Sequence, residues 1–556
     1  MTPRAVSAFP PARAVLAALL LVFAAQAGWL IRAKSPSTDE VPFHLCNGYV
    51  DLLTRDFRMS PVQPPLIREW MGLPWLLIRP KLDLEKDSWK NADSAPFCTE
   101  FFYKDNRAIA DRLLYSARAM VLLLGLALAV AVYLWARTLY GERAALASVA
   151  LFTFSPMMLA HSALGTVDVG AAVFFFLSVF LLHRHFLGGG DGFPWAASVA
   201  LGLALAAKFT AVLLLPVFLI LLVSELGIWR GLARYSGVVF VAFMVTWSAY
   251  FFEFKPLLAG VPRVEEKEGY IAAIADKFTG MDPAAREKLI YAAHHVPMPL
   301  ASWALGLAGT VRERRTPNGH FFLGHWREAG TDHTGKWYFY LFGFLVKSTL
   351  GFLVLLAARK AALFLMPRRD DLYQVLPAVF VIAASCFDTS WRGSRYLMPA
   401  IPFLCVWAGG VFRIFTSRTV LVPCAAALAA HVAASAAQFP YPQQYFNALV
   451  GGPSQGWRYL RDSDLDWGQE LKTFAAWARR HQVTRVKTYL FGSRDEDFYG
   501  IPHVDVEEAE YRAPRRELYA ISTFYLSHFD WTAAATPTDT VGHAIFIYDF
   551  RGKGAS

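Results

Sequence analysis

The chain has 556 residues, of which 55% are hydrophobic and 18% are charged. Apolar runs recur along the sequence, and several approach the roughly 20 residues needed to cross a hydrocarbon core. This pattern excludes a protein made only of soluble domains and predicts a membrane protein. The formal net charge is +10, but Lys and Arg are scattered between apolar runs and no GxxxxGK[ST] loop is present. These features argue against nucleic-acid binding and against a nucleotide-phosphate site.

The first apolar run extends from Val15 to Ile31 and follows Arg4 and Arg13. Basic residues favour the cytoplasmic side, so we predict that the N-terminus is inside and that the run exits on the outer face. A cleaved signal peptide is the alternative, because residues 25–27 read Ala-Gln-Ala. The run continues without a polar break, which favours a retained span.

Ten further apolar segments bring the predicted number of crossings to eleven, and a backbone inside a membrane must be helical to satisfy its own polar groups. The turns predicted to be cytoplasmic carry basic residues, which agrees with a C-terminus outside. The division near Lys208 has an alternative, since 194–226 could form one tilted helix that inverts the later topology. The ten segments are 117–136, 144–161, 167–183, 194–207, 210–226, 235–252, 337–358, 373–388, 397–413 and 419–436.

This topology places three long segments on the outer side, namely 32–116, 253–336 and the tail from Phe439 onward. We therefore expect a mainly α polytopic membrane bundle over residues 1–436. The tail has a polar helix-like stretch followed by short strand-like runs, which predicts a small periplasmic α/β domain over residues 437–556. The predicted tail elements are a helix at 470–481 and strands at 486–491, 518–522 and 544–548.

The first outer segment contains a mixed apolar and charged stretch, Leu66 to Ile78, that is typical of a helix at the membrane interface. A loop helix packed on protein is the equal alternative. Cys46 and Cys98 also lie in this segment, where an oxidising compartment would permit a disulfide. The remaining cysteines, Cys386, Cys405 and Cys424, lie in apolar spans and are expected to be core residues.

Two adjacent carboxylates, Asp39 and Glu40, follow the first span, with His44 four residues after the glutamate. A carboxylate at a membrane surface beside apolar residues can have a pKa suited to accepting a proton from an acceptor hydroxyl. Asp39 and Glu40 are therefore candidate catalytic residues. The alternative is an ordinary solvated start of a loop.

A further carboxylate, Asp168, begins a later apolar helix on the same predicted face and follows His161. Helix capping alone could explain it. His44, His161, Asp39 and Glu40 could also assemble a divalent-metal site, although their spacing does not demand one.

Three basic residues, Lys208, Lys347 and Arg395, stand within apolar sequence near predicted outer helix ends. Charges are costly in a membrane, and these residues could bind a lipid-linked phosphate. For Lys347 the alternative is snorkelling of the ammonium to the headgroups.

In their order along the chain, these segments resemble the polyprenyl-phosphate-sugar-dependent glycosyltransferases, the integral-membrane group that includes protein O-mannosyltransferases and lipid A aminoarabinose transferases. Two departures are Gln63, where some relatives place an acidic residue or histidine, and Asp464, where we expect asparagine. The residues and ranges that carry the resemblance are Asp39-Glu40, Pro64-Pro65-Leu66, 155–168, 202–210, 337–347, 395–399 with Arg395 and Tyr396, 445–453 and 462–469.

The resemblance implies transfer of a sugar, with inversion, from a polyprenyl-phosphate donor to a hydroxyl of a lipid, glycan or protein at the outer face of a bacterial inner membrane. Asp39 would be the base, Glu40 would support it or orient the acceptor, and Asp168 would position acceptor or sugar. Lys208, Lys347 and Arg395 would neutralise the leaving phosphate. The family has no established role for 462–469, for which we predict a fixed interface between tail and membrane domain.

Two other functions fit parts of the pattern. Intramembrane charges also mark transporters, although the long outer segments and the absence of paired half-sequence symmetry argue against one. A non-catalytic scaffold could retain the glycosyltransferase fold, although the intact Asp39 and Glu40 disfavour it. The sequence leaves the sugar, the acceptor, the metal dependence and the oligomeric state open.

Overall fold

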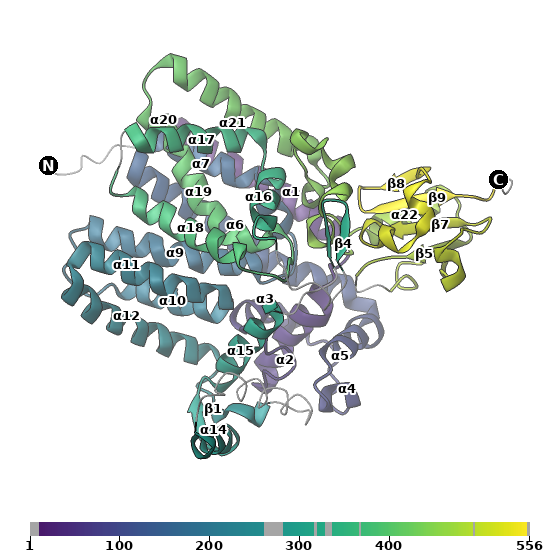
Figure 1. Ribbon diagram of the computed structural model, residues 1–556, viewed down its shortest axis with the longest axis horizontal. Helices are drawn as coiled ribbons and strands as arrows, with labels where there is room; N and C mark the ends of the chain where they lie inside the picture. The colour runs from purple at the N-terminus through teal and green to yellow at the C-terminus, as the bar shows by residue number, and fades with distance from the viewer. Residues whose placement is uncertain are drawn as a thin grey trace.

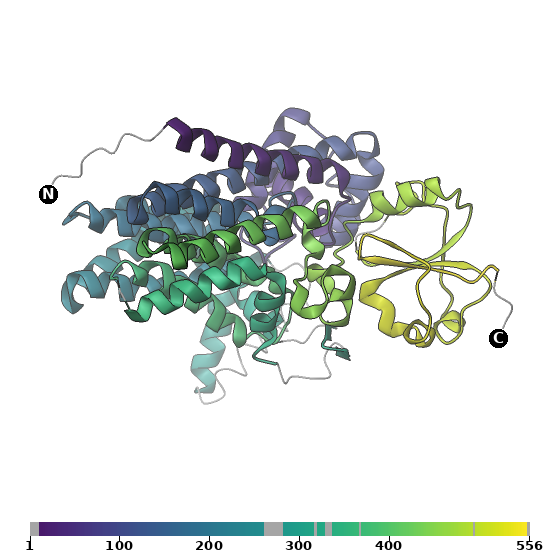
Figure 2. The ribbon, with the colours of Figure 1, turned by 90° about the horizontal axis from the view of Figure 1, so that it is seen from above.

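The computed structural model describes residues 10–260, 282–315, 320–327, 336–365, 368–492 and 495–552. Arg4 and parts of the second outer segment therefore lie outside the described residues. The described chain forms a bundle of long helices, with a small sheet domain at one end (Figure 1). Viewed from above, the sheet lies at the end of the bundle opposite the first residues of helix α1 (Pro10–Ala33) (Figure 2).

Every predicted span is helical over most of its length. Seven described helical stretches are long and apolar enough to cross a membrane, or eight if the pair bent by 112° at Ser348–Thr349 counts as one span. The helical membrane fold is thus confirmed, while the number eleven stays a prediction. The helical elements that cover the predicted spans after α1 are α6 (Ala110–Tyr140), α7 (Glu142–Thr153), α8 (Pro156–His161), α9 (Asp168–Leu187), α10 (Trp195–Ala207), η4 (Phe209–Leu213), α11 (Leu214–Leu226), α12 (Ile228–Ala249), α16 (Phe339–Lys347), α17 (Leu350–Leu365), α18 (Asp371–Cys386), η6 (Ser394–Ala400), α19 (Ile401–Gly409), α20 (Val411–Ile414) and α21 (Arg418–Gln438).

The chain reverses direction at Lys208, where the backbone is extended (φ −161°, ψ 142°) between α10 and η4. Lys208 pairs with Asp168, the first residue of α9, at one end of the bundle. At the other end, His183 of α9 and Glu225 of α11 both contact the neighbouring residues 369–370. Because α9 and α11 run in the same direction, α10 must run back between them, which confirms the predicted division.

The first outer segment folds into short helices that cover one end of the bundle. The predicted helix at 66–78 is confirmed as α3 (Leu66–Ile78), and it packs against α2 (Cys46–Thr54). A Cβ on Gly48 would lie 1.9 Å from the backbone oxygen of Arg68, so only glycine permits this close approach. The other elements here are η1 (Glu40–Leu45), α4 (Asp87–Lys90), α5 (Ser94–Glu100), η2 (Phe101–Asp105) and η3 (Arg107–Ile109).

The second outer segment, in its described parts, consists of two helices and two short antiparallel pairs. The first pair brings together the segments that flank the helix α14, and the second is a hairpin that lies close to the tail (Figure 1). The elements are β1 (Phe254–Pro256), η5 (Leu257–Gly260), α14 (Pro283–His295), β2 (Pro297–Pro299), α15 (Ala301–Arg315), β3 (His320–Phe322) and β4 (His325–Arg327).

The tail contains a five-stranded sheet with strand order β6-β5-β7-β9-β8. Strand β5 is parallel to β6 and β7, whereas β9 is antiparallel to β7 and β8. Apolar residues of α22 cover one face, and aromatic residues around Trp531 cover the other. The predicted α/β fold is confirmed, with β6 and β8 added. The elements are α22 (Leu471–Arg480), β5 (Val486–Tyr489), β6 (His503–Asp505), β7 (Leu518–Ser522), β8 (Asp539–Val541) and β9 (Ile545–Asp549).

Residues 439–470 connect α21 to this domain, contain no named strand and pack on the membrane helices. The side-chain amide of Asn447 donates to the carbonyls of Leu345 (2.7 Å) and Ser348 (2.9 Å), where α16 breaks from α17. These carbonyls are left without helical partners at the break, so Asn447 caps it. The connecting segment is therefore fixed to the helix bundle at this break.

Candidate active site

Asp39 and Arg395 form an ion pair at the end of the bundle nearest the tail. Asp39 lies between α1 and η1, and Arg395 is the second residue of η6. The Arg395 Nη1 to Asp39 Oδ2 distance is 2.9 Å, and the side chains are 11% and 24% exposed. The pair joins residues that are 356 positions apart and leaves the Asp39 side chain partly exposed.

Asp168 and Lys208 form a second pair beside the first. Asp168 begins α9, and the Lys208 Nζ lies 2.5 Å from its Oδ1. The Lys208 ammonium also lies over the ring of Tyr396, 4.6 Å from the ring centroid, and the Arg395 guanidinium lies 5.7 Å from the same centroid. Tyr396 therefore contacts the cations of both pairs, which places the two pairs in one site.

The two predicted histidines lie within the field of these charges. Burial lowers the pKa of His44 to about 4, against the opposing influence of Asp39 and Asp168. His161 is buried at the end of α8, and its ring centroid lies 5.9 Å from that of Trp467. The His44 imidazole is therefore neutral at pH 7, which fits hydrogen bonding to substrate better than anion binding.

Lys347 ends α16, and its ammonium donates to the backbone carbonyls of Gln443 (2.7 Å) and Asp464. Two of its three protons are thus used within the protein. Lys347, Arg395 and His161 nevertheless line the same small cavity, so the lysine charge faces the site.

Glu40 differs from its neighbour Asp39 because it is fully buried. Its carboxylate accepts from Arg118 at 2.7 Å to each oxygen, and from the backbone N–H groups of Ser37 and Gly165. Burial by itself would raise the pKa of Glu40, but the Arg118 charge and these hydrogen bonds hold it below its usual value. Of the two roles expected for Glu40, the geometry favours support of the Asp39 loop over contact with an acceptor.

The tail contributes residues that the sequence did not single out. The indole of Trp467 lies over the Arg395 guanidinium, 4.1 Å from the ring centroid. Asp462 has a positive φ of 58°, and burial raises the pKa of its carboxyl to about 7 despite the nearby Arg395. The range 462–469 was recognisable as a motif, but nothing local in it indicated contact with a residue some 70 positions away.

The hypothesis of a metal site at His44, His161, Asp39 and Glu40 finds no support in the geometry. Within the described residues, no group of three or more His, Cys, Asp or Glu side chains could hold a metal ion. Glu40 is directed to Arg118, which removes it from any such group.

Cys46 and Cys98 are both buried free thiols in the structure. They are hydrogen-bonding neighbours, and burial together with the Cys98 thiol raises the pKa of Cys46 well above its usual value. The Cys98 thiol also contacts Asn47 Oδ1 at 3.4 Å. The disulfide expected from the sequence stays a prediction.

We expect protein prepared from an oxidising compartment to yield a peptide pair linked through Cys46 and Cys98. Mass spectrometry after denaturation without reductant would detect the pair, since the buried thiols must be exposed before labelling. Cys405, buried in α19, is the internal control and should be alkylated without reduction. Full alkylation of all three cysteines would contradict the bridge.

Residues 94–250 match the model of a known protein family, described as dolichyl-phosphate-mannose-protein mannosyltransferase. This match over part of the chain supports the resemblance to glycosyltransferases that the motifs indicated. The matched family segment extends from α5 to the end of α12 and includes Asp168 and Lys208, whereas Asp39 and Arg395 lie outside it. The search of curated proteins found no matching relative.

Solved structures with a similar chain arrangement include ArnT from Cupriavidus metallidurans in the apo state, at 12% identity and a TM-score of 0.48, covering 98% of this chain and 100% of that one. The same protein bound to undecaprenyl phosphate matches at 12% identity and a TM-score of 0.48, and the match covers 96% of this chain and 97% of that one. A third match is the archaeal oligosaccharyltransferase AglB from Archaeoglobus fulgidus, in complex with an inhibitory peptide and a dolichol-phosphate. Its identity is 14% and its TM-score 0.38, and the match covers 76% of this chain and 55% of that one.

Proposed function

We propose that this chain transfers a sugar from a polyprenyl-phosphate donor to a hydroxyl of a lipid, glycan or protein acceptor, with inversion at the anomeric carbon. The observation that carries this proposal is the Asp39–Arg395 ion pair, joined through Tyr396 to Lys208 and Asp168 at one end of a membrane-spanning bundle. In this arrangement the partly exposed Asp39 carboxylate lies beside Arg395 and Lys208, whose positive charges can bind a phosphate. A general base and an anion site are what glycosyl transfer from a lipid phosphate requires.

The reaction uses the two partners of the ion pair separately. Arginine binds phosphate oxygens in a bidentate geometry, so a donor phosphate competes with Asp39 for the Arg395 guanidinium and frees the carboxylate. The acceptor oxygen then bonds to the anomeric carbon while its proton passes to Asp39. The bond from that carbon to the phosphate oxygen breaks, and the polyprenyl phosphate leaves with the electron pair, stabilised by Arg395 and Lys208.

We place the site on the periplasmic side of a bacterial inner membrane. The opposite end of the bundle carries basic residues in ion pairs, including Arg359 of α17 with Asp371 and Arg369, just before α18, with Glu225. An excess of Lys and Arg is typical of cytoplasmic turns, which supports an outer location for Asp39 in this proposal. A lipid-linked donor also fits a catalytic site at the end of a membrane bundle, because the isoprenoid stays in the bilayer.

The purified full-length protein in nanodiscs should transfer sugar from a polyprenyl-phosphate donor, and Arg395→Ala should raise the KM for this donor by about 10- to 100-fold, the usual worth of a hydrogen bond to a charged group. The KM for the acceptor should change little. Labelled-sugar transfer at varied donor and acceptor concentrations measures both constants.

Arg413→Ala is the matched control, since Arg413 is exposed in α20 near the start of α21, away from the site. This variant should keep both constants. An unchanged donor KM in Arg395→Ala would reject the phosphate role. Absence of transfer by the wild type with every polyprenyl-phosphate sugar tested would instead favour the scaffold function.

A further inference from the structure

Residues 466–470 of the tail run alongside residues 34–38 at the end of α1. The backbone N–H groups of Ser35 and Thr38 donate to the carbonyls of Gln469 (3.1 Å) and Trp467 (2.8 Å). The Ser35 hydroxyl donates to the Gly468 carbonyl and accepts from the N–H of Leu471. This pairing fixes the chain that leads directly into Asp39.

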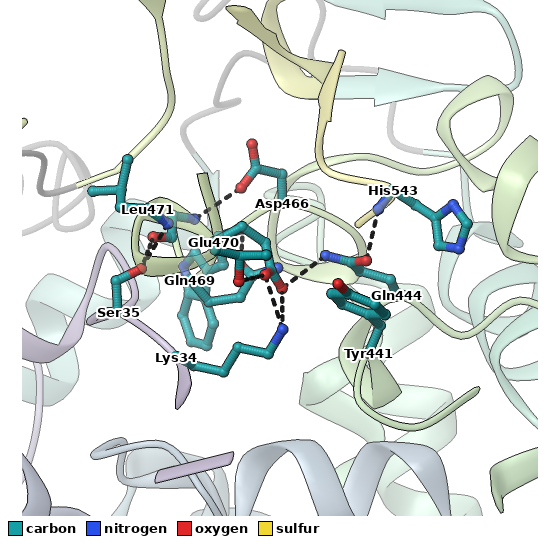
Figure 3. A network of polar contacts seen from close by, with 12 residues as sticks. Lys34, Ser35, Tyr441, Gln444, Asp466, Gln469, Glu470, Leu471 and His543 are labelled. Carbon is teal, nitrogen blue, oxygen red and sulfur yellow. Dashed lines mark hydrogen bonds and ion pairs between the residues drawn. The ribbon is translucent and has the colours of Figure 1, made fainter. Parts of the chain in front are cut away.

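A buried ion pair anchors the same contact. The Lys34 ammonium lies 2.7 and 2.8 Å from the two oxygens of Glu470, and 4.1 Å from the ring centroid of Tyr441. Figure 3 shows Lys34 and Gln444 approaching Glu470 from two sides, and the Gln444 amide in turn accepts from the backbone of His543. The end of α1 is thereby held to the connecting segment and, through it, to the sheet domain.

Trp467 occupies the centre of this contact and is 1% exposed. Its carbonyl accepts from the N–H and the hydroxyl of Thr38, the residue before Asp39. Its indole covers the guanidinium of Arg395 and lies 5.9 Å from the ring of His161, centroid to centroid. The side-chain amide oxygen of Gln469 accepts from the backbone N–H of Trp467 at 2.7 Å, which fixes the backbone at this residue. One tail residue thus contacts three separate parts of the candidate site.

The contact of Trp467 with Arg395 does not depend on Asp39. A cation above an aromatic face is attracted by the ring quadrupole, and the attraction is strongest where water is excluded. When a phosphate displaces Asp39 from the edge of the Arg395 guanidinium, the Trp467 indole still covers the face of that guanidinium. The arginine would therefore keep its position while its anionic partner changes.

We propose that Trp467 is a positioning residue that holds the Arg395 guanidinium in the orientation that receives the donor phosphate. This inference rests on the proposed function and deepens it by assigning a role in donor binding to the 462–469 motif. Trp467 acts through Arg395, so its loss should weaken binding of the polyprenyl phosphate and leave the acceptor KM unchanged.

The test uses full-length protein in nanodiscs, with undecaprenyl phosphate as the binding probe and sugar transfer as the activity. Trp467→Leu should raise the Kd for undecaprenyl phosphate and the donor KM by about 10-fold, the scale of a desolvated cation–π contact. Trp467→Phe, which retains an aromatic face, should recover most of this loss. In the Arg395→Ala background, Trp467→Leu should change the Kd by less than about twofold, because the two residues act as one unit.

Trp477→Leu is the matched control, since Trp477 lies on α22 and its indole N–H donates to Asp539 within the tail domain. It should leave the Kd and both KM values unchanged, and thermal unfolding of all variants would identify a misfolded protein. If wild type binds and transfers while Trp467→Leu does so equally well, or if Trp467→Leu weakens binding equally with and without Arg395, the positioning role is wrong. If wild type neither binds the probe nor transfers sugar, the proposed function itself fails.

Discussion

Asp39→Asn is expected to lower kcat at least about 100-fold, because a positioned general base contributes about 10²- to 10⁴-fold to proton transfer. Asparagine has nearly the same shape and still accepts a hydrogen bond from Arg395, but it cannot take up the acceptor proton. The donor should bind at least as well as before, since the phosphate no longer competes with a carboxylate for the guanidinium. Single-turnover transfer and undecaprenyl phosphate binding measure the two effects separately.

Asp87→Asn is the control for this variant, because Asp87 is an exposed carboxylate at the start of α4 in the same outer segment. It should retain wild-type transfer. Full activity in Asp39→Asn would contradict the assignment of the base. The next carboxylate to test would be Asp462, which lies close enough to Arg395 and Asp39 for both charges to affect its pKa.

Much of the fold was predictable because each span had to be apolar and helical. The break near Lys208 and the tail strands were readable for the same local reasons, namely a basic residue inside an apolar run and alternation between turn residues. The interruption of the span predicted at 144–161 was not foreseen. There, Ser155 caps a new short helix with Pro156 at its first position, a signal that the apolar composition concealed.

The candidate site was predictable only in part. Topology alone brings four of the predicted residues near one another, because each lies at a helix end on the same side of the membrane bundle. These residues are Asp39, Asp168, Lys208 and Arg395. The different environments of Asp39 and Glu40 were not predictable, because burial of Glu40 depends on Arg118, 78 positions away. The same limit applies to Trp467, whose contact with Arg395 arises from tertiary packing.

Glu40→Gln is expected to destabilise the protein by about 3–5 kcal/mol, because it leaves the Arg118 charge buried without its partner. Arg118 also donates to the backbone carbonyls of Ile31, Lys34 and Ser35 (2.8–3.0 Å), so the pair joins α6 to the end of α1. Thermal unfolding in nanodiscs would show the loss as a lower Tm. Glu100→Gln is the control, since its partly exposed ion pairs with Lys86 and Lys104 should contribute less than about 1 kcal/mol.

Acidification separates this ionic role from a loss of packing. The pKa of Glu40 in the folded protein lies below its usual value of 4.5, so the stabilisation is present at neutral pH and is lost as the pH falls from about 4.5 through the folded pKa. The wild type should therefore lose more stability than Glu40→Gln over this range, and the two curves should converge. A double variant, Glu40→Gln with Arg118→Met, should regain part of the lost stability, because it removes the unpaired charge and keeps the side-chain volume. Curves that stay parallel on acidification, together with no recovery in the double variant, would show that Glu40 acts through its shape rather than its charge.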